Sequence, residues 1–575
     1  MDISDVRKII IAVDFGTTFS GVAWAQTSHP DVHYLINQWP DVASSTAIGG
    51  MASEKVPTEV AYEYKRSSRS ESSEPKLVWG FQIPAIMPRL QWIKLGLDPS
   101  QVQKTTMNSD CRNASLPHHT TTEGAVTDYL TCLREHVVSL IESRVGSLFE
   151  KFSLEYVITV PAIWSDKAKM ATLSCAKEAG FGEPSQIHIV SEPEAVAIHA
   201  LKASNPHGIE VGDTIVICDA GGGTVDLITF TVTQLKPHLR LKEQAPGTGA
   251  LCGSTFLNRR FEGFLKERLS SIEEWEHDTL EEAMGRFELV AKRTFAGNPD
   301  EDFMIPVPGL ADNKEKGIRR GRLRVTGKEM IDIFQPVLQE VRDLVRGQVN
   351  ASRTKVKAIF LVGGFGQNPY LRKPLLESFP GIRVLAPVDG WTAVVRGALT
   401  KAMMDASPST TAPLVESRVA RKHYGMIIGT KFIDGLHDKK KKYWDFYRGE
   451  YRIQVMDWYI RKGDDIKEDS PIKTSYYQVQ SAEDGPFEAI HTKFYELDSS
   501  EPAPLYFDRR MKTHAVLHPS LDWIEQSRMP TCFGSDGAKY YKIDFKIHAS
   551  YFSAHCEYSL WYKGTNHGSV KVDYV

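Results

Sequence analysis

The sequence predicts an α/β protein with two similar lobes, followed by an all-β domain. Three observations carry this prediction. Strand and helix patterns alternate through the first 400 residues, and one strand–turn–strand motif occurs twice within them. Aromatic residues then become dense, since 27 of the 57 lie within residues 411–575. Short aromatic and β-branched runs between turn signals are typical of antiparallel sheets.

Composition limits the classes of protein to which the chain can belong. Its 575 residues are 42% hydrophobic and 25% charged, as in ordinary globular proteins. The net charge of −3 argues against a nucleic-acid binder, and no apolar stretch approaches the roughly 20 residues of a membrane-spanning helix. Seven cysteines without a CxxC pair fit reduced thiols. We expect a cytoplasmic or nuclear protein with neither nucleic acid nor membrane as a partner.

The elements of the two lobes follow from hydrophobic periodicity. Apolar runs predict strands over 8–12, 156–160, 214–218 and 358–362. Helical spacing predicts helices over 125–149, 166–179, 192–203, 256–269, 281–295 and 328–348. We expect the first lobe over about 8–205 and the second over about 212–385, with a return to the first lobe over about 386–402.

Two motifs recur at nearly the same offset. IIIAVDFGTTFSGVAW (9–24) and TIVICDAGGGTVDLITF (214–230) are each a strand that ends in Asp, a Gly/Thr turn and a second strand. Asp14 and Asp219 are 205 residues apart, and the strand ends Val160 and Val362 are 202 apart. This repetition predicts a duplicated lobe whose corresponding turns face each other across a cleft.

The two turns have the chemistry of a phosphate site. Glycines let the backbone approach an anion closely, successive N–H groups form an anion-binding nest, and Thr hydroxyls add donors. Asp14 and Asp219 would repel each other in a closed cleft, and a hydrated Mg²⁺ between them would relieve that repulsion. The candidate phosphate ligands are Gly16, Thr17, Thr18, Gly221, Gly222, Gly223 and Thr224.

Each turn also has an ordinary interpretation. A single DxGTT segment is often only a hairpin turn, and a GGGT segment is often only a flexible loop. Their pairing at matched spacing favours nucleotide binding over both.

Five motifs in order resemble those of a known superfamily. The two turns, with VPAIWSDKAK, SEPEAVAIHAL and FLVGGFGQNPYL, resemble the actin-like ATPases over residues 8–402. Within that superfamily the chain resembles a divergent 70-kDa heat-shock chaperone, because VPA, Ser-Glu-Pro and AKRTF occur together. The resemblance implies duplicated actin-like lobes around a cleft that binds ATP or ADP with Mg²⁺.

The resemblance assigns roles at the phosphate end of the cleft. Asp14 and Asp219 match the acids that hold Mg²⁺, mainly through water, and Asp226 matches an acid that orients water and metal. Glu192 matches the acid of an Asn-Glu-Pro motif, here Ser-Glu-Pro, although an acid also suits the first turn of a helix. Lys94 matches the lysine that assists attack on the γ-phosphate; the alternative is a surface lysine. The catalytic candidates are Lys94, Glu192, Asp219, Thr224 and Asp226.

The adenosine side of the cleft departs from the family pattern. Gly363 and Gly364 match a turn at the ribose and phosphates, and Lys292 and Arg293 match a helix pair at the adenine. Gly253 matches one glycine of a Gly-Gly-Glu-Asp turn. The family's two acids in that turn are Ser254 and Thr255 here, its arginine is Gln367, and its helix acid falls on Leu289, beside Glu288.

The C-terminal region resembles the family's peptide-binding β-sandwich. The resemblance implies a linker over 403–414 and a substrate- or partner-binding domain over 415–575, without a helical lid. Client proteins or peptides and co-chaperones are the implied partners. Trp444, Tyr447, Trp458 or Trp561 could line a groove, although aromatic residues commonly fill the cores of small β-sandwiches.

Three functions agree with these patterns. The leading one is an ATP-binding, slowly hydrolysing chaperone of the heat-shock 70 type that couples nucleotide state to the β-domain. A nucleotide-sensing scaffold with little hydrolysis is the alternative, because the adenine pocket and linker are altered. A small-molecule kinase would need an acidic base near a sugar pocket, for which the sequence has no motif.

Overall fold

The computed structural model divides the chain into two compact units. One unit comprises residues 1–239 and 247–411, and the other comprises residues 240–246 and 412–575. The described residues are 7–42, 50–63, 75–84, 87–99, 120–203, 208–236, 239–406, 415–467, 469–485, 487, 490, 492–517, 521, 524–525, 528–552, 556–569 and 572–574.

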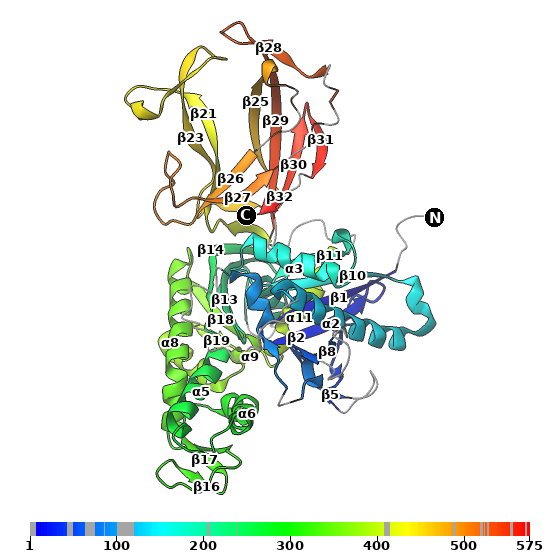
Figure 1. The fold of residues 1–575 in the computed structure, drawn as a ribbon, viewed down its shortest axis with the longest axis vertical. Coiled ribbons are helices and arrows are strands. Elements are labelled where there is room, and N and C mark those ends of the chain that lie inside the picture. The colour runs from blue at the N-terminus through cyan, green and yellow to red at the C-terminus, as the bar shows by residue number, and fades with distance from the viewer. Residues whose placement is uncertain are drawn as a thin grey trace, which may run out of the picture. The chain divides into compact units, whose positions relative to one another are not determined.

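The first unit contains two sheets with the same strand order (Figure 1). One has the order β11-β10-β1-β2-β3, with β11 (Ile187–Ser191), β10 (Ser153–Val160), β1 (Lys8–Asp14), β2 (Phe19–Gln26) and β3 (Tyr34–Leu35). The other is longer and includes the matching order β19-β18-β12-β13, with β19 (Arg383–Leu385), β18 (Val356–Val362), β12 (Thr214–Ala220) and β13 (Val225–Gln234). In both, the first three strands are parallel and the fourth is antiparallel.

The repeated motifs occupy equivalent strands of these sheets. Asp14 ends β1 and Asp219 lies one residue before the end of β12, while Val160 ends β10 and Val362 ends β18. The central strands are mostly apolar and almost entirely buried, as expected of parallel strands covered on both faces of the sheet. The four strands predicted for the lobes are therefore confirmed.

Long helices cover these sheets, and their ends follow capping rules. The helix α8 begins with a capping box, in which Thr326 and Glu329 each accept a backbone N–H of the other. The helix α2 begins where the Thr121 side chain accepts the N–H of Gly124. The helices are α2 (Thr122–Val145), α3 (Asp166–Glu178), α4 (Glu192–Ala203), α5 (Thr255–Leu269), α6 (His277–Arg286), α7 (Lys292–Thr294), α8 (Gly327–Ala351), α9 (Gly363–Gly366), α10 (Pro369–Ser378) and α11 (Ala393–Asp405).

All six predicted helices are present. The segment predicted as one helix over 281–295 is instead α6, a π-helical turn η6 (Phe287–Ala291) and α7. The predicted linker over 403–414 begins inside α11, and its residues 407–414 lie outside the described part of the chain. Within the described residues, no helix is long and apolar enough to cross a membrane.

Short elements complete the first unit. Three small sheets have the orders β4-β5, β8-β7-β9 and β15-β17-β16, and β6 pairs with β2. Their strands are β4 (Gln38–Trp39), β5 (Met51–Ala52), β6 (Val56–Pro57), β7 (Glu59–Glu63), β8 (Lys76–Trp79), β9 (Leu90–Gln91), β15 (Asp302–Pro306), β16 (Ile318–Arg319) and β17 (Arg322–Thr326). Single 3-10 turns are η2 (Gly80–Gln82), η3 (Ile93–Leu97), η4 (Gly146–Lys151), η5 (Pro184–Gln186) and η7 (Gly390–Thr392).

The second unit is built from antiparallel sheets. One has the order β22-β23-β21-β26-β27-β32, with β22 (Tyr443–Asp445), β23 (Glu450–Ile460), β21 (His423–Lys431), β26 (Thr492–Leu497), β27 (Lys512–Leu517) and β32 (Val572–Tyr574). The other has the order β25-β29-β30-β31, with β25 (Ile472–Ser481), β29 (Lys539–Tyr551), β30 (Cys556–Tyr562) and β31 (Thr565–Ser569), and β28 (Thr531–Phe533) pairs with β29. Side chains of both sheets share one hydrophobic core, which includes Phe494 and Phe545.

Two short strands and the beginning of a third also belong to this unit. The strand β20 (Val415–Val419) pairs antiparallel with β24 (Asp465–Lys467) and parallel with the first residues of β14 (Arg240–Ala250). The helical elements named within the described part of 415–575 are the 3-10 turns η8 (Lys439–Lys441) and η9 (Ala482–Asp484). The antiparallel strands expected from the short aromatic and β-branched runs of this region are present, for example β29 and β30.

Candidate functional site

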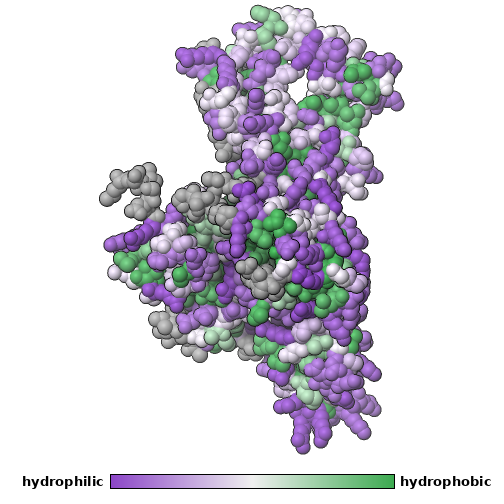
Figure 2. Space-filling view, turned by 180° about the vertical axis from the view of Figure 1, so that it is seen from behind, coloured by the Kyte–Doolittle hydropathy of each residue, from purple (hydrophilic) through white to green (hydrophobic). Residues whose placement is uncertain are grey.

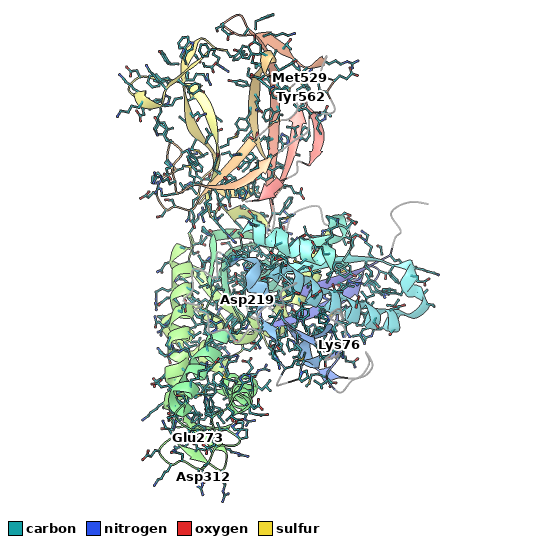
Figure 3. All side chains as sticks on the ribbon, viewed as in Figure 1. Lys76, Asp219, Glu273, Asp312, Met529 and Tyr562 are labelled. Carbon is teal, nitrogen blue, oxygen red and sulfur yellow. The ribbon has the colours of Figure 1, made fainter. Side chains whose placement is uncertain are left out.

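A pocket of about 410 Å³ inside the first unit brings the two repeated turns together. Asp219 lies there in the interior of the unit (Figure 3). Of the candidates from the sequence, the residues that line it are Asp14, Gly16, Thr17, Thr18, Lys94, Glu192, Asp219, Gly221, Gly222, Gly223, Thr224, Lys292, Arg293, Gly363 and Gly364. The candidates Asp226 and Gly253 lie behind this lining.

The two turns are in direct contact, which explains why glycine occupies the second one. A Cβ on Gly222 would lie 2.0 Å from Thr18 Oγ1, and a Cβ on Gly223 would lie 2.6 Å from Thr17 Cγ2. Gly16 has a similar constraint, because its Cβ would lie 2.2 Å from the carbonyl oxygen of Phe19. A side chain at any of these glycines would therefore push the two turns apart or distort one of them.

A third segment fixes the second turn from behind. Within the turn, the N–H of Gly221 donates to the carbonyl of Thr224 over 2.9 Å. The N–H groups of Gly253, Ser254 and Thr255 donate to the carbonyls of Gly223, Gly221 and Gly222. The Thr255 hydroxyl adds a second bond to Gly222, over 2.9 Å. Ser254 and Thr255 stand where the family pattern has two acids. In the structure, both residues support the second turn through these hydrogen bonds.

Four buried carboxyl groups gather around the pocket. Asp14 and Asp219 come from the two repeats, Glu192 begins α4, and Asp226 pairs with Asp219 across β12 and β13. Burial, together with the neighbouring Glu192, Asp14 and Asp226, holds the pKa of Asp219 well above its usual range. Burial also raises the pKa of Glu192 to about 7, against the opposing effect of Lys94. The protein therefore buries several mutually repelling carboxyl groups here at a cost in stability.

Lys94 is a buried residue of the pocket wall, so its interpretation as a surface lysine is wrong. Its side chain is 1% exposed, and its Nζ lies 2.6 Å from Glu192 Oε1. The ammonium also lies over the rings of Phe15 and Trp164, 5.6 and 5.3 Å from their centroids. These contacts fix a positive charge beside the two turns.

Lys55 is a pocket residue that the sequence did not identify. Its Nζ lies 2.5 Å from Asp14 Oδ2, and both side chains are buried. Lys55 precedes β6, outside every motif, and only the pairing of β6 with β2 brings it to the pocket. Nothing in the local sequence around Lys55 marks it as a ligand.

The π-helical turn η6 changes which residue supplies the acid near Lys292. By simple counting along a helix, the family's acid falls on Leu289, but that side chain is 63% exposed. Glu288 instead faces the pocket and pairs with the buried Lys292, and both contact Asn258. The attraction of Lys292 lowers the pKa of Glu288 despite burial, whereas burial lowers the pKa of Lys292. The pocket therefore has an acid beside Lys292, supplied by Glu288.

The remaining side of the pocket contains the Gly363 turn and an indole ring. Gly363 has φ +83°, and a Cβ there would lie 2.4 Å from Asp219 Oδ1. A Cβ on Gly364 would lie 3.3 Å from the ring of Trp391, over which the Arg293 guanidinium lies at 5.8 Å. Gln367, at the position of the family's arginine, lines the pocket and donates to the carbonyl of Pro387.

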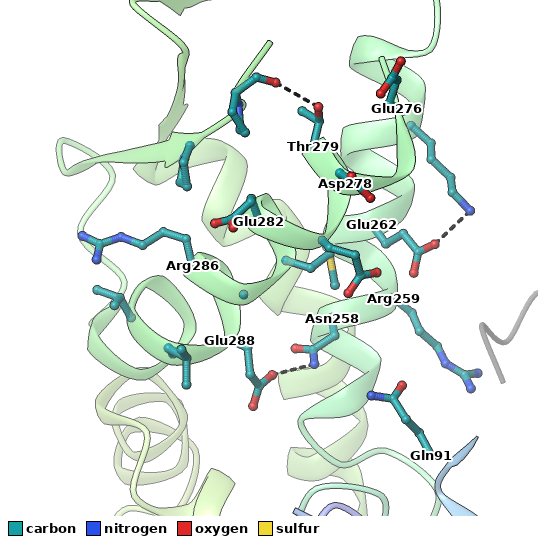
Figure 4. Close-up of a pocket in the computed structure, with 18 of the residues that line it drawn as sticks. Gln91, Asn258, Arg259, Glu262, Glu276, Asp278, Thr279, Glu282, Arg286 and Glu288 are labelled. Atoms are coloured by element: carbon teal, nitrogen blue, oxygen red, sulfur yellow. Dashed lines mark hydrogen bonds and ion pairs between the residues drawn. The ribbon is translucent and has the colours of Figure 1, made fainter. Parts of the chain in front are cut away.

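A second and larger hollow, of about 1460 Å³, adjoins this site through Glu288, which lines both (Figure 4). Acidic side chains of α5, α6 and the segment between them line much of it, including Glu262, Glu276 and Glu282. At its edge Trp92 has φ +56°, and the Arg259 guanidinium lies 4.5 Å from its ring centroid. The smaller pocket is the candidate site, because the glycine turns and the two lysines converge there.

The residues present fit a phosphate chain with a divalent cation. The turns offer glycine backbone and Thr hydroxyls, and the wall offers the cations Lys55 and Lys94. Asp14 and Asp219 provide carboxylate oxygens, which Mg²⁺ prefers. A cation between them would also offset the repulsion that raises the pKa of Asp219.

Two sheets of equal strand order, with paired Gly/Thr turns at one pocket, define a duplicated phosphate-binding α/β fold. Comparison with protein families matches residues 125–416 to the family described as Hsp70 protein. The chain belongs to the Hsp70 family. The first unit accordingly contains an ATPase domain of the Hsp70 type, and membership of the family implies nucleotide binding.

Comparison with individual proteins gives the same family. The chain is 25% identical to heat shock 70 kDa protein 12A of Mus musculus over 520 residues, covering 75% of this chain and 74% of the relative. It is 24% identical to heat shock 70 kDa protein 12B of Homo sapiens, covering 76% and 73%. A chaperone protein DnaK of Thermoplasma volcanium is 24% identical over 255 residues, covering 42% and 38%. The chain is therefore a divergent member of the family.

Proposed function

We propose that the protein binds ATP with Mg²⁺ in the 410 Å³ pocket, hydrolyses it slowly, and acts as a molecular chaperone. The convergence of the two repeated turns on one pocket, each with its own Asp, carries this proposal. Two carboxylates and two glycine turns from opposite sheets are suited to a metal–triphosphate complex. In this proposal the two sheets belong to actin-like lobes that close around the nucleotide.

The pocket residues have distinct roles in the proposed reaction. Asp14 and Asp219 would hold Mg²⁺, mainly through water, and that ion would neutralise charge on the phosphates. The glycine turns would orient the phosphate chain through backbone N–H groups. Lys94, fixed by Glu192 at 2.6 Å, would compensate the charge that develops on the transferred phosphoryl group. Thr224 would orient the attacking water, and Asp226, which does not line the pocket, would act only through its neighbours.

Single-turnover hydrolysis tests these roles. We expect Asp219→Ala and Thr224→Val to reduce the rate of ATP decay far more than they reduce nucleotide binding. The reason is that both residues act on the reacting phosphate or its water rather than on the nucleoside. Unchanged turnover in both variants would refute the assignment.

A nucleotide-sensing scaffold is the second candidate function. Two observations favour it: Lys94 is paired with Glu192, and Gln367 replaces the family's arginine on the adenosine side. Such a protein would bind nucleotide without useful turnover. ATP decay followed for hours at enzyme excess separates the two, because only the first candidate converts all bound ATP.

We further propose that the second unit, with two sheets arranged as a β-sandwich, binds a client protein or peptide under control of the nucleotide. Figure 2 shows hydrophobic side chains on its surface among polar ones. Trp444 and Phe446 are 45% and 65% exposed, whereas Trp458 is buried and donates its Nε1–H to Pro504. Trp561 stacks on His548 and Tyr447 packs on Tyr540. Trp444 is thus the candidate contact, and Trp458 belongs to the core.

A photo-crosslinking peptide library tests client binding. We expect labelling within 415–575 that changes between ATP and ADP and falls in Trp444→Ala. The control is Phe533→Ala, at an exposed aromatic position of β28. Absence of labelling with either nucleotide would rule out peptide binding by this unit.

A further inference from the structure

Lys55 is a buried cation of the pocket that has no part in the proposed reaction. Its side chain is 8% exposed, it lines the same cavity as the two glycine turns, and its Nζ contacts Asp14 Oδ2 at 2.5 Å. Burying an ammonium group costs free energy. A buried lysine beside a candidate phosphate site therefore suggests a function in that site.

The pairing of three strands places the Lys55 side chain next to Asp14. The strand β6 pairs with β2 at Ser20↔Val56, so the next position places Lys55 at the level of Gly21. Gly21 in turn pairs with Asp14 across β2 and β1. A Cβ on Gly21 would lie 3.1 Å from Lys55 Cγ and 3.3 Å from its Cε, so the lysine stem lies over the bare glycine. Lys55 thereby crosses β2 to reach Asp14.

The same segment is attached to the first turn. Thr58 donates its backbone N–H to the carbonyl of Thr18 over 2.8 Å and its hydroxyl to the carbonyl of Gly16 over 2.8 Å. The ammonium is therefore fixed relative to the turn that is the candidate phosphate ligand. An ammonium has three N–H donors, and Asp14 takes one of them in the contacts of the described residues.

We propose that Lys55 is a phosphate-binding residue of the nucleotide site, with its ammonium bridging Asp14 and the phosphate chain. This inference rests on the proposed nucleotide binding. Lys55 places a positive charge next to Asp14, the carboxylate that would also hold Mg²⁺. Lys55 and Mg²⁺ would therefore both neutralise negative charge at the same part of the pocket. The protein consequently depends less on Mg²⁺ for nucleotide affinity than it would without Lys55.

Titration calorimetry with ADP, in Mg²⁺ and in EDTA, tests this inference. The variant Lys55→Met keeps the stem that packs on Gly21 and removes the charge. In EDTA we expect it to bind ADP about tenfold or more weakly than the unmodified protein, since a charged hydrogen bond is lost. In Mg²⁺ the loss should be about threefold or less, because the ion then occupies Asp14. Lys55→Arg should restore most of the affinity in EDTA.

Two controls separate phosphate binding from a structural role. Adenosine carries no phosphate and should bind Lys55→Met and the unmodified protein equally. Lys8→Met removes a different lysine–carboxylate pair, Lys8–Glu155, at the start of β1 in the same sheet and should change neither affinity. If Lys55→Met does not fold, Lys55→Gln replaces it, because its amide can still hydrogen-bond Asp14 without the charge.

The outcomes distinguish this inference from the function on which it rests. An equal loss of ADP affinity with and without Mg²⁺, or a loss for adenosine, would overturn it and make Lys55 structural. Unchanged ADP affinity in EDTA would also overturn it. If the unmodified protein binds no nucleotide even in Mg²⁺, the proposed function fails and this inference fails with it.

Discussion

At the scale of single residues, the buried carboxyl groups of the pocket lower the stability of the fold, and we propose that they are retained for nucleotide binding. Buried carboxylates that repel one another destabilise a fold unless a cation compensates them. Asp219 and Glu192 both have raised pKa values, and burial is the largest cause for each. Removing such a charge should therefore improve stability while it damages function.

We predict that Asp219→Asn raises the melting temperature of the nucleotide-free protein at pH 8 and slows ATP hydrolysis far more than it weakens Mg-nucleotide binding. The folded pKa of Asp219 is raised, so its contribution to stability is present at low pH and is lost as pH rises through that value. The gain should therefore be larger at pH 8 than at pH 5. Thermal unfolding at both pH values, with the exposed Asp332→Asn as control, measures it. A destabilised Asp219→Asn would contradict the electrostatic explanation.

We predict that Gly222→Ala disables the site by sterics alone. The new methyl group would lie 2.0 Å from Thr18 Oγ1, so the two turns must separate. Affinity for Mg-ADP should fall by about 100-fold, which corresponds to roughly 2.7 kcal/mol. The matched control is Gly263→Ala in α5, where a Cβ meets nothing within 4 Å and where Ala favours the helix. Equal ADP affinity in the two variants would show that the turns do not hold phosphate.

At the scale of elements, the periodicity of the sequence predicted the main strands and helices of the first unit. It did not predict features that depend on irregular backbone or on pairing between distant strands. The strands that carry Asp14 and Asp219 and the helix α4 were predictable, because buried runs and cap residues mark them. The π-helical turn η6 was not predictable, because one extra residue in a helical turn leaves no recognisable pattern in the local sequence. Lys55 was also not predictable, because its place depends on the pairing of β6 with a distant strand.

We predict that Glu288, and not Leu289, is the functional acid of this helix. Glu288→Ala leaves the buried Lys292 without its carboxylate, which should cost about 3 kcal/mol of unfolding free energy and weaken ADP binding. Leu289→Ala changes an exposed neighbour and should do neither. Urea denaturation and ADP titration of both variants measure these effects. A larger loss in Leu289→Ala would show that the helix continues without the π-turn.

At the scale of the whole molecule, duplication explains how the candidate site forms. Two sheets with one strand order each supply a turn and an Asp, and the matching offsets of 205 and 202 residues reveal this in the sequence. The fold class and the two turns at the pocket could therefore be predicted. The details of the rest of the pocket could not, because Ser254, Gln367 and Trp391 act through tertiary contacts that motifs do not encode.

The central claim is that two turns, one from each repeat, form a Mg-nucleotide site. Isothermal titration with Mg-ATP and Mg-ADP, repeated on the double variant Asp14→Asn/Asp219→Asn, tests it most directly. We predict one nucleotide per chain for the unmodified protein, and no measurable heat of binding for a double variant whose circular dichroism is unchanged. Absence of binding by the unmodified protein, or full binding by the double variant, would contradict the claim.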